Sequence, residues 1–191
     1  SPTTLPAGVH GGNLDIVEVC PGSTIHLPVA TPGGYLYLGD AHAAMGHGEL
    51  SASGLEMPAA STITIRLEKG RTILGPRIET ATDIMTIVSG TPMERSAAQA
   101  FAQLILWMEA DFGWNRWEAY DLLTHVATTS IGQSSVQSQR RSATGQLTLS
   151  TSLMPAECTG PASPPAARPA RIAAISRSPR WPEDARKPST M

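Results

Sequence analysis

Short apolar segments separated by turn residues place the strongest constraint on the fold of this chain. Between residues 13 and 89 these segments are rich in β-branched and aromatic residues, a composition typical of strands. Pro-Gly, Gly-Gly, Lys-Gly and Gly-Pro pairs stand between them and provide the backbone conformations that chain reversal requires. The pattern predicts an antiparallel β layer made of these segments: Leu14–Val19, Thr24–Val29, Tyr35–Leu38, Ser61–Leu67 and Ile84–Val88.

A change of periodicity then predicts two helices. Apolar residues recur at spacings of three and four, which gives a helix over about 92–110 a single apolar face. Gly113 is a predicted stop, and Asn115 with Glu118 three residues later predicts the start of a second helix that runs to residue 128. The short link makes a helical hairpin that can cover one face of the sheet. The predicted fold class is α+β, mainly β.

Composition divides the chain into a body and a tail. The tail, residues 134–191, holds half of the 16 prolines and carries 8 − 3 = +5 charges, whereas the body carries 6 − 13 = −7. Residues 147–155 are a predicted remnant of a further strand, so the domain is expected to span 1–155. Residues 156–191, rich in Pro, Arg, Ser and Ala, bury too little apolar area to offset chain entropy, and we expect them to be disordered.

The tail has two interpretations. A shifted reading frame can produce such a composition, and a natural basic tail can contact acidic partners. The charge of the acidic body argues against nucleic-acid binding by the folded part.

The cellular setting is also constrained by the sequence. The two cysteines form no C-x-x-C pair, which fits a reducing cytoplasm better than a disulfide framework. No segment reaches the ~18 apolar residues of a membrane span. The chain begins with Ser1, and residues 13–19 read like the middle of a fold, so we expect an upstream portion.

The segment 39–49 carries the most unusual chemistry. Four side chains that can bind a metal lie within ten positions: Asp40, His42, His47 and Glu49. In extended backbone, residues two apart point to one side, so each carboxylate can join an imidazole at one point. Mixed nitrogen and oxygen ligands favour zinc or another divalent first-row metal over calcium or magnesium. The alternative is a solvated turn, because Gly, Asp and His are also ordinary loop residues.

Four blocks of residues resemble the acetamidase/formamidase family in their order and spacing. They are Gly11-Gly12-Asn13-Leu14-Asp15, Gly22-Ser23-Thr24 through Leu27-Pro28-Val29, Gly39-Asp40-Ala41-His42-Ala43-Ala44, and Gly46-His47-Gly48-Glu49 with Glu56 beyond it. The resemblance continues to Ile131-Gly132-Gln133. It covers the first two-thirds of this chain and only the later portion of a full-length family member.

The resemblance implies hydrolysis of a short-chain amide to a carboxylic acid and ammonia, in the cytoplasm, by a homo-oligomer. An amide is a poor electrophile with a poor leaving group, so such a site must polarise the carbonyl, deliver water and protonate the nitrogen. A metal bound by Asp40 and His42 can perform the first two tasks. Glu49 is then the predicted general base.

The remaining candidates have alternatives that stay open. Asn13 and Asp15 are predicted to orient the amide or help to bind the metal, although such residues before a strand often cap their own backbone. Glu56 is a second carboxylate candidate, or a solvated strand end. His47 stands where the family has an acidic residue, and is either a third metal ligand or an exposed substitution.

Three functional interpretations follow from the sequence. The chain is an amidase active together with an upstream half, an inactive family fragment that binds a metal, or a β-rich binding or assembly module.

Overall fold

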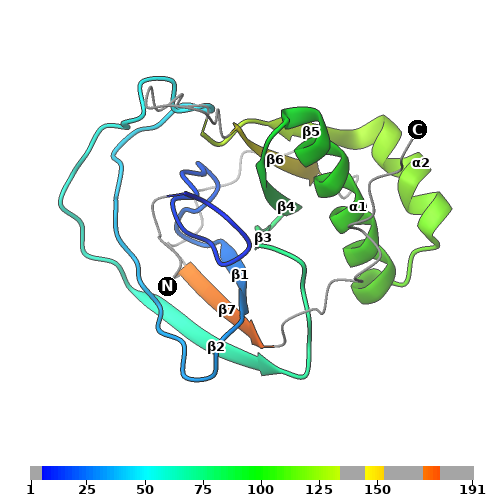
Figure 1. Cartoon of the computed structure of the whole chain (residues 1–191), viewed down its shortest axis with the longest axis horizontal. Helices are drawn as coiled ribbons and strands as arrows, with labels where there is room; N and C mark the ends of the chain where they lie inside the picture. Colours follow the sequence, from blue (N-terminus) through cyan, green and yellow to red (C-terminus); the bar gives the residue numbers. More distant parts are fainter. Residues whose placement is uncertain (1–5, 134–144, 153–169, 177–191) are drawn as a thin grey trace, which may run out of the picture.

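The computed structural model describes residues 6–133 and, by their backbones, residues 145–152 and 170–176. The seven strands form one sheet in the order β2-β7-β1-β3-β4-β6-β5 (Figure 1). The elements in chain order are β1 Thr24–Val29, β2 Ile63–Lys69, β3 Arg77–Glu79, β4 Asp83–Gly90, α1 Met93–Phe112, α2 Arg116–Val126, β5 Ala127–Ser130, β6 Gly145–Ser152 and β7 Ala170–Ser176. The structure confirms the predicted α+β class, mainly β.

The sheet is antiparallel except at β7. The pairs β1–β3, β3–β4, β4–β6 and β5–β6 are antiparallel, whereas β7 lies parallel to both β1 and β2. The prediction of disorder for 156–191 therefore does not hold for Ala170–Ser176, because these residues form backbone ladders on both sides. The rest of that segment lies outside the described residues. Strand β6 overlaps the predicted remnant at 147–155.

Strand β4 is the central element because it is buried on both faces. Ile84 and Val88 pack against the helices, and Thr86 Oγ1 donates to the carbonyl of Ala100 in α1 at 2.8 Å. Met85 and Ile87 alternate with them and point to the opposite face. A second core forms there from Ile16, Ile25, Ile78, Met85 and Ile87, with Leu14, Leu27 and Ile63 packed at its edge. The helices thus cover only one of the two buried faces (Figure 1).

The helical hairpin forms where the sequence predicted it. Helix α1 ends at Gly113, whose φ of 72° is the left-handed conformation that glycine adopts without strain. Asn115 caps α2 by accepting a hydrogen bond from the Trp117 N–H at 2.9 Å. Helix α2 ends at Val126, and the two residues after it, which were predicted to be helical, begin β5.

Two predicted strands are absent. Residues 14–19 and 35–38 form no strand, and short β3 was not predicted. The composition of both segments suits a strand, but neither finds a ladder partner for its backbone groups. Leu14 and Ile16 nevertheless keep the alternation of a strand, since both face the second core.

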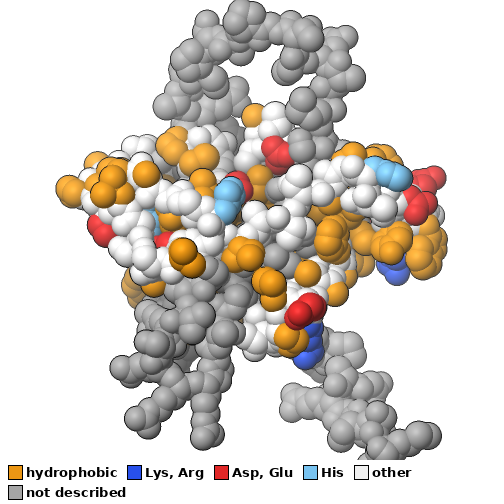
Figure 2. Space-filling view, turned by 90° about the horizontal axis from the view of Figure 1, so that it is seen from above, with side chains coloured by type: hydrophobic (Ala, Val, Ile, Leu, Met, Phe, Trp, Pro, Cys, Tyr) orange, Lys and Arg blue, Asp and Glu red, His pale blue; other side chains and the backbone are white. Residues whose placement is uncertain are grey.

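Large apolar side chains remain exposed at several places outside these cores. They include Tyr35, Tyr37 and Leu50 on the loop between β1 and β2, Ile65 and Leu67 on β2, and Trp117 and Tyr120 on α2. Figure 2 shows apolar side chains at both ends of one face. Neither helix in the described part of the chain is long and apolar enough to cross a membrane.

Truncation of Leu104 tests the helix-facing core. Leu104 is 0% exposed, so Leu104→Ala should lower the free energy of unfolding by about 2–5 kcal/mol through lost burial and a residual cavity. The matched control is Leu106→Ala on the same helix, which is 38% exposed and should cost less than about 1 kcal/mol. Urea unfolding measures both values, and equal losses would show that α1 does not pack as described.

Candidate functional site

The loop between β1 and β2 folds back on itself and brings together three side chains that can bind a metal. Ala43 donates its N–H to the carbonyl of Leu55 at 2.8 Å, and Leu55 returns a bond to Ala44 at 2.8 Å. These bonds place His42 opposite Glu56 in an antiparallel bridge. Asp40 lies two residues before His42, so a local reversal gathers side chains that are 16 positions apart at most.

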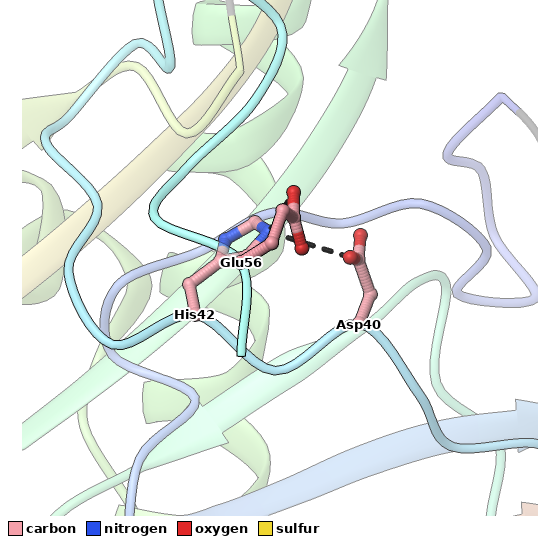
Figure 3. A group of neighbouring side chains, drawn as sticks. All are labelled: Asp40, His42 and Glu56. Atoms are coloured by element: carbon pink, nitrogen blue, oxygen red, sulfur yellow. Dashed lines mark hydrogen bonds and ion pairs between the residues drawn. The ribbon is translucent and has the colours of Figure 1, made fainter. Parts of the chain in front are cut away.

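The three side chains point toward one another (Figure 3). His42 Nε2 lies 3.3 Å from Asp40 Oδ1 and 3.1 Å from Glu56 Oε1. One ligand atom from each residue lies within 4.8 Å of the others, and this is the group of potential metal ligands found within the described residues. Burial disfavours the charged imidazole, but the carboxylates of Glu56, Asp40 and Glu49 outweigh it and raise the pKa of His42.

The ring of His42 is enclosed on its other side. Its Nδ1 lies 3.3 Å from Met45 Sδ. A Cβ placed on Gly54 would lie 2.6 Å from Nδ1 and 2.7 Å from Cγ, closer than real Cβ contacts come. Glycine at position 54 is therefore what allows the imidazole to lie flat against the returning chain.

The N-terminal segment carries Asn13 and Asp15 beside residues of the second core. Leu14 and Ile16, on either side of Asp15 in the sequence, pack into the second core. The side-chain amide of Asn13 donates to Asp15 Oδ2. The hydrophobic core thus anchors the segment that carries these two polar groups.

A distant glutamine joins Asp15 to Glu49. Gln133 Nε2 donates both to Asp15 Oδ2 and, at 2.9 Å, to Glu49 Oε2. Backbone contact holds the two segments in place, since the Gly48 N–H donates to the carbonyl of Gly132 at 3.0 Å. Glu49 is buried, with 6% of its surface exposed. Three chain segments therefore meet at one pair of carboxyl groups.

The surroundings of Asp15 favour its protonated form. Burial is the largest cause, and the nearby carboxylates of Glu49 and Asp40 add to it, so that the pKa of Asp15 rises to about 6. A hydrogen bond with Glu49 acts in the same direction. Asp15 therefore exchanges a proton at mildly acidic pH, and it lies near enough to Asp40 to feel the charge of that carboxylate.

Backbone strain coincides with the acidic side chains. Asp15, Asp40 and Glu49 have φ values of 42°, 64° and 36°, in the left-handed region that residues with a Cβ seldom adopt. Such conformations persist only where surrounding contacts enforce them, and they are frequent at functional sites. Three separate acidic residues of one cluster share this property.

The predicted site residues therefore meet with one exception. Asn13, Asp15, Asp40, His42 and Glu49 lie in the cluster or next to it. His47 is exposed and is not part of the metal-ligand group, where Glu56 takes the third place. His47 lies within a turn in which the Glu49 N–H donates to the carbonyl of Gly46. In this turn the side chain of His47 is exposed to solvent, whereas Glu49 is buried. Sequence reasoning used Gln133 only to mark the end of the resemblance and missed its role.

Replacement of Asp15 tests the cost of its burial. A native pKa above the unfolded value of 3.8 means that the folded chain binds more protons between about pH 4 and pH 6, so stability falls as pH rises through that window. Asp15→Asn removes this loss, and the variant should be more stable than the wild type by about 1 kcal/mol above pH 6, after allowance for solvent screening. Near pH 3.5 the advantage should vanish.

Urea unfolding of metal-free protein across this range measures the difference. The exposed Asp121→Asn on α2 is the matched control and should show no pH-dependent gain. A constant difference between wild type and Asp15→Asn at every pH would contradict the assignment of a raised pKa.

Comparison with known proteins finds relatives of this chain. The chain is 39% identical over 67 residues to the formamidase of Methylophilus methylotrophus, a match that covers 35% of this chain and 16% of that protein. Two crystal structures are also similar: the acetamidase of Yersinia enterocolitica, with a TM-score of 0.62 and 30% identity, and the acetamidase of Bacillus halodurans, with 0.62 and 28%.

The extent of these matches limits what they show. The structural matches cover 78% of this chain but 43% and 49% of the two acetamidases, so the chain spans less than half the length of these relatives. The family profile itself matches residues 1–136, which include every residue of the cluster described above. The chain belongs to the Acetamidase/Formamidase family.

Proposed function

We propose that this chain provides the acid–base and metal-binding groups of an amidase that hydrolyses short-chain amides to a carboxylate and ammonia. The supporting observation is that a buried carboxyl pair, Asp15 and Glu49, lies next to the group formed by Asp40, His42 and Glu56. Membership of the family supports the reaction class. The names formamidase and acetamidase of the relatives support formamide and acetamide as substrates.

The donor set of the loop fits a divalent metal ion. Asp40, His42 and Glu56 would hold it through two carboxylates and one imidazole, a mixed set that suits zinc or another first-row metal. Three protein ligands leave a position for water or substrate, as in catalytic zinc sites. An ion bound there would supply Lewis acidity toward the amide carbonyl and lower the pKa of a bound water to about 7.

The remaining steps belong to the buried pair. Glu49 accepts a proton from the attacking water, and Asp15, a fraction of which is protonated near neutral pH because its pKa is about 6, delivers one to the departing nitrogen. The amide group of Asn13 fixes the orientation of the Asp15 carboxyl. Gln133 donates to both carboxyl groups from the same nitrogen and so links the two.

The second candidate function is metal binding without catalysis of amide hydrolysis. It is favoured by the exposure of Asp40 and Glu56. Water is excluded poorly from such a site, which weakens the electrostatic stabilisation on which amide hydrolysis depends. A cytoplasmic location and a homo-oligomer remain predictions in either case.

Metal content and ammonia release test the proposal together. Elemental mass spectrometry should find a divalent metal in the purified wild type, and His42→Ala should lose it, because the imidazole is the nitrogen ligand of the group. His47→Ala is the matched control and should retain the metal. Ammonia release from formamide should be abolished in His42→Ala and reduced by about 100-fold or more in Glu49→Gln.

Each outcome assigns a function. Metal with ammonia release supports the amidase, and metal without release supports the second candidate. Equal metal loss in His42→Ala and His47→Ala would contradict the proposed ligand set, and the absence of metal and activity would refute both candidates.

Alanine at position 54 tests the position of the His42 ring. Because the new Cβ would overlap Nδ1 and Cγ, Gly54→Ala should displace the ring and weaken metal binding by about 10-fold or more. Gly46→Ala is the matched control, since nothing lies within 4 Å of its added Cβ. Titration calorimetry with zinc measures both affinities, and an unchanged affinity in Gly54→Ala would exclude His42 as a ligand.

A further inference from the structure

A buried arginine on the helix-facing side of the sheet has no carboxylate partner within residues 6–133. Arg77, in β3, is 6% exposed, and its Nε has no hydrogen-bond acceptor. The arginine ion pairs of the described residues involve Arg66, Arg71 and Arg116 instead. Since buried charges are normally paired, this guanidinium needs an explanation.

Aromatic rings form the surroundings of the guanidinium. Its Cζ lies 4.8 Å from the centroid of the Trp107 ring, within the range of a cation–π contact. His26, the register partner of Arg77 in β1, meets the same indole edge-on with 5.9 Å between ring centroids. Trp107 is fixed in turn, because its Nε1–H donates to Asp111 Oδ2 at 2.7 Å. The indole that contacts the guanidinium is therefore held in place by this hydrogen bond.

Among the described residues, no carboxylate acts on the charge of Arg77. Arg71 is close enough to act on Arg77, but it is already paired with both Glu68 and Asp111. Burial lowers the pKa of His26, and the contact with Glu79 does not reverse this, so the imidazole is neutral at neutral pH. Burial and then Arg71 lower the pKa of Arg77 to about 10, which leaves it charged.

We propose that Arg77, stacked on Trp107, binds a small monocarboxylate such as formate or acetate. The planar fork of a guanidinium matches the two oxygens of a carboxylate, and a single negative charge balances the single unpaired positive one. The aromatic neighbours suit the small apolar end of such an anion. The site shares no residue with the acidic cluster, whose negative charges would repel a carboxylate.

The proposed ligand belongs to the same chemical class as the acid product of amide hydrolysis. A role of the site in product binding during turnover rests on the proposed function. Binding itself does not, because the anion can be added to the protein without substrate or metal.

The indole N–H resonance of Trp107 reports binding directly. Sodium formate and sodium acetate should shift this resonance saturably in the wild type. Sodium chloride at equal ionic strength is the reference for charge screening. The resonance is assigned to Trp107 by its absence from the spectrum of Trp107→Phe. In Arg77→Met the affinity should fall by about tenfold or more, the ratio expected for one charge-assisted hydrogen bond. The matched control is Arg66→Met, because the Arg66 side chain is 77% exposed and should leave the response unchanged.

Thermal unfolding gives a second measurement that does not depend on the resonance. Formate should raise the Tm of the wild type and of Arg66→Met but not that of Arg77→Met, since only a site in the folded state gains stability from its ligand. No response in the wild type, an equal response in Arg77→Met, or an equal effect of chloride would each overturn the proposal. A Tm that rises with protein concentration but not with formate would assign the guanidinium to a carboxylate of another polypeptide and would also overturn it.

Discussion

The burial of β4 on both faces is the constraint on which the other parts of this molecule depend. Ile84 and Val88 attach the helical hairpin to one side of the sheet, and Met85 and Ile87 attach Leu14 and Ile16 to the other. The second attachment has the chemical consequence, because the residues that it anchors lie on either side of Asp15 in the sequence. Apolar packing thereby places Asp15 in the cluster, although the segment makes no strand.

The acidic cluster, in contrast to the cores, destabilises the folded state. Asp15, Asp40, Glu49 and Glu56 bring like charges together, and three of them adopt left-handed backbone conformations. Folding tolerates this because contacts from elsewhere compensate for part of the cost: His42 lies between two carboxylates, and the Gln133 amide bridges the other two. Local strain of this kind is characteristic of residues selected for chemistry rather than for folding.

The sequence predicted those features whose determinants are local. Periodicity located both helices, and the caps at Gly113 and Asn115 follow from the conformation and hydrogen bonding of single residues. Strand composition succeeded at β1, β2 and β4 but failed at 14–19 and 35–38, because a strand also needs a partner whose identity lies elsewhere in the chain. For the same reason the ladders of β7 and the bond from Gln133 to Asp15, which spans 118 positions, could not be derived from neighbouring residues.

The two parts of the acidic cluster have different requirements, and their burial reflects this difference. In the proposed function Asp15 needs surroundings of low dielectric to raise its pKa, and it is partly buried where the N-terminal segment meets the chain around Gln133. A metal-binding group needs an open position for water or substrate, and Asp40 and Glu56 remain exposed. In the proposed function, a substrate at this boundary would meet the metal group from solvent and the carboxyl pair from the protein side. The loop between β1 and β2 would then control access, and the N-terminal segment would control acidity.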